Sequence, residues 1–138
     1  MNEYKFEELE IGQSESFDVT VTEKMMELFL SVSNDSNPLH NDLEFAKEHG
    51  FDNKVVYGLL TTSFISKLVG VLLPGKYCLI QGIETKFLKP VYVGDHLKII
   101  GVVKDLHSSV KRATIDVTIN NKDIKVVKAK VEVGFLKY

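Results

Sequence analysis

The sequence predicts an α+β domain in which a curved antiparallel sheet is wrapped around one central helix. Residues 58–73 have the length of a helix, hold Lys67 as their only charge and carry apolar groups on every side of the helical wheel. A helix that is apolar all round must be buried. The second half of the chain supplies the cover, because strand patterns follow one another there with short breaks and no further helix signal.

Composition favours one domain over 1–138. The chain has 44% hydrophobic residues, and 17 basic against 19 acidic residues give a net charge of −2. Arg112 is the single arginine, so a nucleic-acid partner is not expected. Cys78 is the only cysteine and excludes an intrachain disulfide. Acidic residues near the start and the lack of a membrane-length apolar stretch lead us to expect a cytoplasmic protein without a membrane partner.

A strand and a helix are predicted before the central helix. Apolar and polar residues alternate over 17–21, which is typical of a half-buried strand. Thr22 suits the N-cap of the helix that follows over 25–32. This helix carries one apolar stripe with the spacing i, i+3, i+4 and i+7, formed by Met25, Leu28, Phe29 and Val32.

A second, shorter helix is predicted over 43–49. Asp42 can cap its free amides, and Gly50 suits the left-handed residue that ends it. The two short helices together form a helical flap that carries the turn between them.

Four strand patterns follow the central helix, which Pro74 and Gly75 terminate. They lie over 80–91, 97–103, 115–119 and 127–133. Their alternation indicates antiparallel strands with one face buried and one face in water. Short breaks between them predict a meander.

The turn Asp35-Ser36-Asn37-Pro38-Leu39-His40 is the candidate site. It sets a carboxylate and an imidazole five residues apart beside a proline that fixes the backbone. A carboxylate ordinarily titrates near pH ~4 and an imidazole near ~6.5, so the two groups could share the donor and acceptor roles of one reaction. Taken alone, the same residues could also simply end a helix, with His40 exposed.

Three segments in order carry a resemblance to a known family. The turn 35–40 matches a signature of Asp, any residue, Asn-Pro, an apolar residue and His. Residues 56–60, with Ser63, match the segment that opens the family's central helix, and 87–95 match its Phe…Pro-Val…Gly-Asp strand and turn. Over nearly its whole length the chain resembles the MaoC-like dehydratases and (R)-specific enoyl-CoA hydratases of the hot-dog fold. We therefore expect a single MaoC-like hot-dog domain.

The resemblance implies a hydro-lyase reaction and a set of roles. Water is added syn across the double bond of a 2-enoyl thioester to give the (R)-3-hydroxyacyl thioester, or the reverse. Asp35 and His40 would bind and activate the water, and the sequence leaves open which is the base. The Gly58 amide would donate to the thioester carbonyl, where enolate charge accumulates, from the positive end of the buried helix. No cofactor is expected beyond the coenzyme A or acyl carrier protein of the substrate.

Ser63, Asn37 and Tyr57 complete the candidate substrate-binding residues. We hypothesise that Ser63, which matches a family serine, hydrogen-bonds the site; as a small residue it could instead allow close packing. Asn37 is expected to hold the loop through bonds from its side chain to the backbone. Tyr57 stands where many family members carry His, and it has no titration near neutral pH. We expect a changed pocket shape or substrate range, with activity retained.

Other interpretations of these residues were weighed against the hydratase. No metal is expected, because a site built from Asp35, His40, Asp42 and His49 fits no zinc spacing. Hot-dog thioesterases and acyl-carrier-protein dehydratases take an Asp or Glu from the central helix, and 58–73 contain neither. A non-catalytic protein that binds acyl thioesters stays an alternative. The other histidines are interpreted as surface or structural residues: His49, His96 and His107.

The sequence supports only general expectations about the carrier of the acyl group and about the oligomeric state. Coenzyme A phosphates or an acidic carrier protein would both attract cations at a tunnel mouth, although scattered lysines are usually solvated. The candidates are Lys86, Lys89, Lys111 and Arg112. A lone curved sheet would leave an exposed edge and an open acyl tunnel, so we expect a homodimer or a higher oligomer of dimers.

Overall fold

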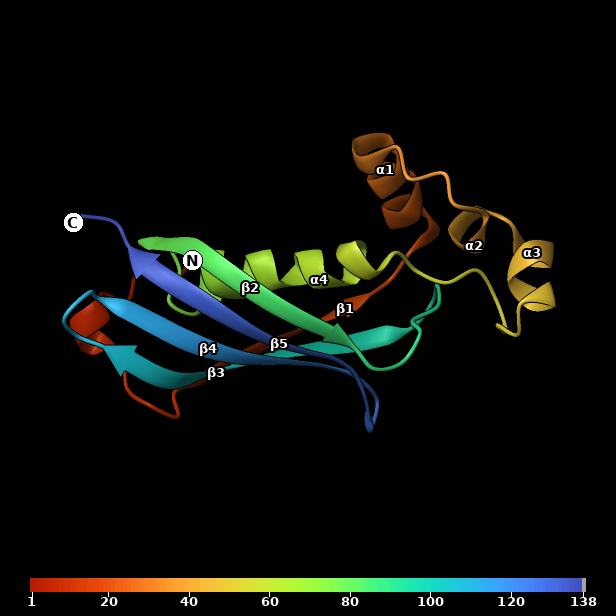
Figure 1. Ribbon diagram of the computed structural model, residues 1–138. Helices are drawn as coiled ribbons and strands as arrows, with labels where there is room; N and C mark the ends of the chain where they lie inside the picture. The colour runs from red at the N-terminus through yellow and green to blue at the C-terminus, as the bar shows by residue number, and fades with distance from the viewer. Residues whose placement is uncertain (138) are drawn as a thin grey trace.

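The computed structural model describes residues 1–137 and confirms the α+β class. A five-stranded antiparallel sheet packs along one face against the central helix, and three short helices lie beyond the end at which that helix begins (Figure 1). The elements are η1 Phe6–Glu8, β1 Ser14–Thr20, α1 Glu23–Ser33, α2 Pro38–Asn41, α3 Leu43–Glu48, α4 Gly58–Lys67, η2 Leu68–Leu72, β2 Cys78–Phe87, β3 His96–His107, β4 Arg112–Asn121 and β5 Ile124–Phe135. Within the described residues, no helix is long and apolar enough to cross a membrane.

The strand order is β1-β3-β4-β5-β2, so the predicted meander is correct for β3, β4 and β5 and wrong for β2. β2 pairs with β5 at the far edge of the sheet (Figure 1). The reason is the connection over 88–95, which replaces a tight turn with a longer path that crosses one end of the sheet. Leu88 starts this path with a bond from its amide to the Val126 carbonyl, at 2.8 Å.

The core lies between α4–η2 and the concave face of the sheet. Ile65 and Leu68 are fully buried there, together with inward residues of the strands such as Ile99 and Ile115. The helix approaches β3 closely at Gly101, where a Cβ atom would lie 2.7 Å from Leu68 Cδ2. Gly101 therefore sets how tightly the helix sits on the sheet.

The prediction that the central helix is buried on every side is wrong for the single chain. Leu59 is 68% exposed, and Ser63 and Lys67 are also exposed on the same face. The helix is also less regular than predicted, because α4 passes into the single π-helical segment η2 after Lys67. The face stays open because the sheet packs against one side of the helix only, and the described residues leave the other side in solvent.

The helical flap forms as predicted, with one exception. Thr22 Oγ1 accepts the Met25 amide at 3.2 Å, which caps α1. The stripe on α1 is only half covered, however: Met25 and Phe29 pack against the core, whereas Leu28 is 54% and Val32 82% exposed. Because α1 touches the body of the domain along a narrow line, only part of its apolar surface is covered.

The second helix of the flap also begins and ends where expected. Asp42 Oδ1 accepts the Phe45 amide at 3.1 Å, which caps α3. Gly50 follows the helix with φ +88°, a conformation that a residue with a side chain rarely adopts.

Candidate active site

The turn between α1 and α3 is built by local hydrogen bonds. Asn34, with φ 54°, ends α1, and Asp35 Oδ1 then accepts the Asn37 amide at 3.1 Å. Asn37 Oδ1 accepts the Leu39 amide at 2.9 Å, so Asn37 caps the short helix α2. This helix was not predicted; Pro38 occupies its first position, where a proline loses no hydrogen bond.

His40 is oriented by a main-chain carbonyl. Its Nδ1 lies 2.6 Å from the Val55 oxygen, and because a carbonyl only accepts, Nδ1 carries a hydrogen. In the neutral ring, Nε2 is then the atom with a free lone pair. Val55 itself is held between two segments, since its amide donates to the Leu39 carbonyl at 3.1 Å and its backbone bridges to Tyr92.

The free nitrogen of His40 faces the carboxylate of Asp35. His40 Nε2 and Asp35 Oδ2 are 4.0 Å apart, which is too far for a direct hydrogen bond. An oxygen atom placed against both could bond to each. The Asp35 side chain is 46% exposed and that of His40 only 14%, so the pair lies at the boundary between solvent and interior.

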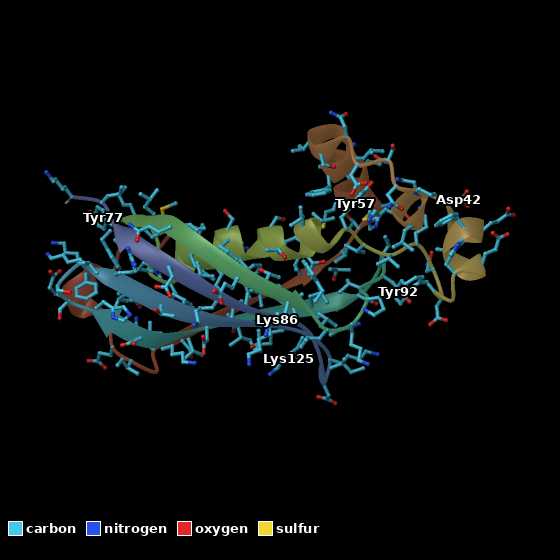
Figure 2. The ribbon with its side chains drawn as sticks, viewed as in Figure 1. Asp42, Tyr57, Tyr77, Lys86, Tyr92 and Lys125 are labelled. Atoms are coloured by element: carbon cyan, nitrogen blue, oxygen red, sulfur yellow. The ribbon has the colours of Figure 1, made fainter. Side chains whose placement is uncertain are left out.

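Tyr57, which directly precedes α4 (Figure 2), contacts both members of the pair. It is 2% exposed, and its ring centroid lies 4.2 Å from that of His40 and 4.8 Å from that of Phe29. Its hydroxyl is 3.0 Å from the Asp35 carbonyl oxygen and 3.3 Å from Asn41 Oδ1, so its single hydrogen can be donated to either acceptor. Tyr57 therefore supports the imidazole with its ring and the backbone of Asp35 with its hydroxyl.

Two hollows meet beside this pair. The first, the Asp35 hollow, has a volume of about 380 Å³ and is lined by Phe29, Ser33, Asp35, His40, Tyr57, Gly58, Leu59 and Phe87. The second, the apolar hollow, has a volume of about 280 Å³ and is lined by His40, Phe51, Val55, Val56, Gly58, Thr61, Phe87, Leu88, Lys89, Pro90, Val91 and Val127. Three residues line both: His40, Gly58 and Phe87.

Gly58 lies between the two hollows as the first residue of α4. No side chain caps this helix, and the first amides of a helix have no partner within it. The partial positive charge of the helix dipole is concentrated at the same end. A Cβ atom on Gly58 would lie 3.0 Å from Cε1 and Cζ of Phe87, so the glycine is required for the approach of that ring. The position can donate a hydrogen bond to an oxygen that develops negative charge.

The structure does not bring Ser63 to the catalytic pair. The Ser63 hydroxyl donates to the Leu60 carbonyl at 2.6 Å. In the part of the chain that the structure describes, Ser63 is exposed and lines neither hollow. Conversely, sequence reasoning missed Phe29 and Phe87 as site residues. Phe87 carried a signal, because it opens the third matching segment, within the predicted strand 80–91.

The four candidate cations do not gather at one entrance to the hollows. Lys89 lines the apolar hollow, and Lys86 comes just before Phe87 at the same end of β2 (Figure 2). Arg112 lies near the other end of the sheet, opposite Gly134, and donates to Gln81 Oε1 at 2.9 Å. Lys111 precedes it there and pairs with Glu7 at 2.6 Å. Lys86 nevertheless points to the outer face of the sheet, where it lines a depression with Glu84 and Lys104, so of the four candidates Lys89 alone lines a hollow of the site.

The remaining histidines are engaged elsewhere. His96 Nε2 lies 3.2 Å from Asp18 Oδ1, and His107 Nε2 lies 3.6 Å from Asp105 Oδ2. His49 stacks on Phe45 with ring centroids 4.1 Å apart. In the part of the chain that the structure describes, no three His, Cys, Asp or Glu side chains converge in a way that could hold a metal ion.

Comparisons with known proteins agree on one family. The model of the MaoC-like domain matches residues 6–127. The (R)-specific enoyl-CoA hydratase of Rhodospirillum rubrum is 36% identical over 90 residues, which are 65% of this chain and 62% of that protein. A mitochondrial 3-hydroxyacyl-[acyl-carrier-protein] dehydratase of Arabidopsis thaliana is 38% identical over 76 residues, 55% of this chain and 43% of that protein. The alignments thus span less than two thirds of the length of these two relatives.

Solved structures give the same result for the fold. The (R)-hydratase from A. caviae involved in PHA biosynthesis superposes with a TM-score of 0.88 at 31% identity, covering 93% of this chain and 98% of the other. PhaJ1 from Pseudomonas aeruginosa, an R-hydratase, also gives 0.88 at 28% identity, covering 96% and 86%. The predicted hot-dog fold is confirmed.

Proposed function

The chain belongs to the family of MaoC-like domains, and we propose that it is a hydratase that adds water syn to a 2-enoyl thioester, or removes it from the (R)-3-hydroxyacyl thioester. The observation that carries the proposal is the separation of 4.0 Å between His40 Nε2 and Asp35 Oδ2, beside the first amide of α4. The activities named for similar proteins support it.

The orientation of His40 suggests how the proton moves. With Nδ1–H donated to Val55, Nε2 accepts one proton of a water that Asp35 holds through its other hydrogen. As the water oxygen bonds to C3, the imidazole becomes imidazolium, and the nearby carboxylate stabilises its charge. The imidazolium then returns that proton to C2. Both additions come from one side of the double bond, which gives the syn course.

The amide of Gly58 supplies the charge stabilisation that this proton transfer requires. Electrons displaced from the double bond collect on the thioester oxygen as an enolate before C2 is protonated. A preorganised amide at the start of α4 donates to that oxygen, and the helix dipole has the favourable sign there. Losing one donor of this kind costs on the order of 10²–10³ in rate in a well-studied acyl-transfer enzyme.

Incubation with crotonyl thioesters tests the proposal. Loss of the conjugated absorbance reports hydration, and chiral analysis of the product must give the (R) isomer. We expect Asp35→Asn and His40→Ala each to lower kcat by roughly 10²-fold or more. Asp42→Asn is the matched control, since Asp42 caps α3 and lines neither hollow. A folded protein that hydrates no enoyl thioester contradicts the proposal.

We propose coenzyme A as the carrier, with Lys89 at the apolar hollow as the cation nearest its phosphates. Crotonyl thioesters of coenzyme A and of an acyl carrier protein should be compared at equal concentration. Lys89→Ala should raise KM for the coenzyme A thioester, whereas Lys122→Ala, a lysine in the turn between β4 and β5, should not. A clear preference for the carrier-protein substrate would overturn this assignment.

We further propose that two chains associate through β2, in a homodimer. β2 is an edge strand with free backbone groups on one side, which another strand can extend. Apolar side chains are exposed along it and on the neighbouring face of α4: Leu59, Leu79, Ile80, Ile83 and Phe87. Pairing of an antiparallel strand with its own copy gives two-fold symmetry. Light scattering should give twice the mass of one chain, and Ile83→Lys should halve it, whereas Ile124→Lys on β5 should not.

A further inference from the structure

The turn 92–95 ends the connection between β2 and β3, at the end of the sheet that faces the flap (Figure 2). It is closed by two hydrogen bonds. The Asp95 amide donates to the Tyr92 carbonyl at 3.0 Å, and Asp95 Oδ2 accepts the Tyr92 amide at 2.9 Å. The half-buried carboxylate of Asp95 therefore holds the main chain of Tyr92 in place.

One side of this turn holds the segment that orients His40. The backbones of Val55 and Tyr92 lie opposite each other in an isolated antiparallel bridge. Next to the bridge, the Val56 amide donates to the Val91 carbonyl at 2.8 Å. The Val55 carbonyl is left to accept His40 Nδ1 at 2.6 Å. The position of the imidazole thus depends on where the turn places Val55.

The other side of the turn holds the start of α1. The Gly94 amide donates to the Val21 carbonyl at 2.8 Å, and the Val21 amide donates to the Asp95 carbonyl at 3.0 Å. Val21 directly precedes Thr22, the cap of α1, and Asp35 follows the far end of this helix. A helix of 11 residues is about 16 Å long, so a tilt of about 4° at its start moves its far end by about 1 Å. One turn is thus connected to both members of the catalytic pair.

We propose that Asp95 is a positioning residue for the proton transfer, which acts through the turn 92–95 on His40 and Asp35. The inference rests on the hydratase function proposed above. Asp95 lines neither hollow, so its effect is transmitted by the main chain. His40 depends on the turn more strongly than Asp35, whose carbonyl is also contacted by the Tyr57 hydroxyl at 3.0 Å. A misplacement of about 1 Å in a reacting group can cost on the order of 10²-fold in rate.

Steady-state kinetics with crotonyl-CoA test this role. Asp95→Ala removes the acceptor of the Tyr92 amide and should lower kcat roughly tenfold with little change in KM. Asp95→Glu keeps the charge but lengthens the side chain, and it should lower kcat less. Asp95→Asn keeps an acceptor oxygen in the same place and should keep kcat close to that of wild type. Asp105→Ala is the matched control, because Asp105 also accepts a main-chain amide, that of Leu106, near the opposite end of β3.

The tautomer of His40 gives a readout that needs no turnover. In nitrogen NMR of isotope-labelled protein, at a pH where the imidazole is neutral, wild-type His40 should carry its hydrogen on Nδ1. The signals of His40 are identified by their loss in His40→Ala. Asp95→Ala should shift part of the population to the tautomer with the hydrogen on Nε2, whereas Asp95→Asn and Asp105→Ala should not.

The two readouts separate this inference from the proposed function. If the wild type hydrates nothing but the tautomer shifts as expected, the reaction is wrong and the role of Asp95 stands. If folded Asp95→Ala and Asp95→Glu proteins keep the kcat and the tautomer of wild type, the role of Asp95 is overturned. The same conclusion holds if Asp105→Ala lowers kcat and shifts the tautomer as much as Asp95→Ala does.

Discussion

Replacing Tyr57 with Phe removes one hydroxyl and leaves the ring that supports His40. The hydrogen lost is the one that the Asp35 carbonyl at 3.0 Å or Asn41 Oδ1 at 3.3 Å accepts. A buried acceptor left without a partner costs about 1–3 kcal/mol, and because Asp35 is half-exposed, water can partly replace the bond. We expect a loss of about 1 kcal/mol in the free energy of unfolding, which corresponds to a fall in Tm of about 3–5 °C.

The same substitution should slow the reaction because it changes the position of Asp35. Without the bond to its carbonyl, the backbone of Asp35 is less well fixed, and the water it holds is less well aligned with C3. Misplacement of a reacting group is costly, and we expect kcat to fall on the order of tenfold while KM changes little.

Thermal unfolding and steady-state kinetics with crotonyl-CoA measure the two effects separately. Tyr92→Phe is the matched control, since the Tyr92 hydroxyl accepts only a long bond of 3.4 Å from the Asp52 amide and Tyr92 lines neither hollow. A Tyr57→Phe protein with wild-type Tm and kcat would refute the idea that the hydroxyl holds the turn. A lower Tm with unchanged kcat would restrict Tyr57 to a structural role.

Three further outcomes are expected. Gly58→Ala should lower kcat with crotonyl-CoA by roughly tenfold or more, because the new Cβ meets Phe87 at 3.0 Å and displaces the start of α4; unchanged kinetics would contradict this role. Burial raises the pKa of the Cys78 thiol, so its reaction with a disulfide reagent at mildly alkaline pH should be slower than that of free cysteine, and an equal rate would show the thiol to be accessible. Thr85→Val should raise the free energy of unfolding by about 1 kcal/mol, because the buried Thr85 hydroxyl has no partner within residues 1–137; a destabilised variant in urea titration would mean that it has one.

Features that depend on neighbours in the sequence were predictable. The caps at Thr22 and Asp42 form because a side-chain oxygen three residues away reaches a free amide of the first turn. The strand alternation correctly separated the buried and exposed faces of β3, β4 and β5, although each strand is longer than its pattern.

Features that depend on distant segments were not predictable from the pattern. Nothing local to β2 states that its partner is β5, because a connection such as 88–95 can lead to either edge of a sheet. The exposed face of α4 and the uncovered half of the α1 stripe have the same origin, since hydrophobic spacing says which residues prefer burial and not what covers them. Phe87 meets Gly58 only because the end of β2 lies under the start of α4.

The hydrogen bond from His40 to Val55 uses the main chain of Val55 and leaves its side chain free to vary. Its acceptor is a peptide oxygen, which every amino acid at position 55 would provide, so replacement of the Val55 side chain leaves the imidazole oriented. The Val55 side chain meanwhile belongs to the wall of the apolar hollow. Mutation at position 55 can therefore reshape the hollow while the orientation of His40 is inherited unchanged, an arrangement that lets ligand preference diverge around one fixed imidazole.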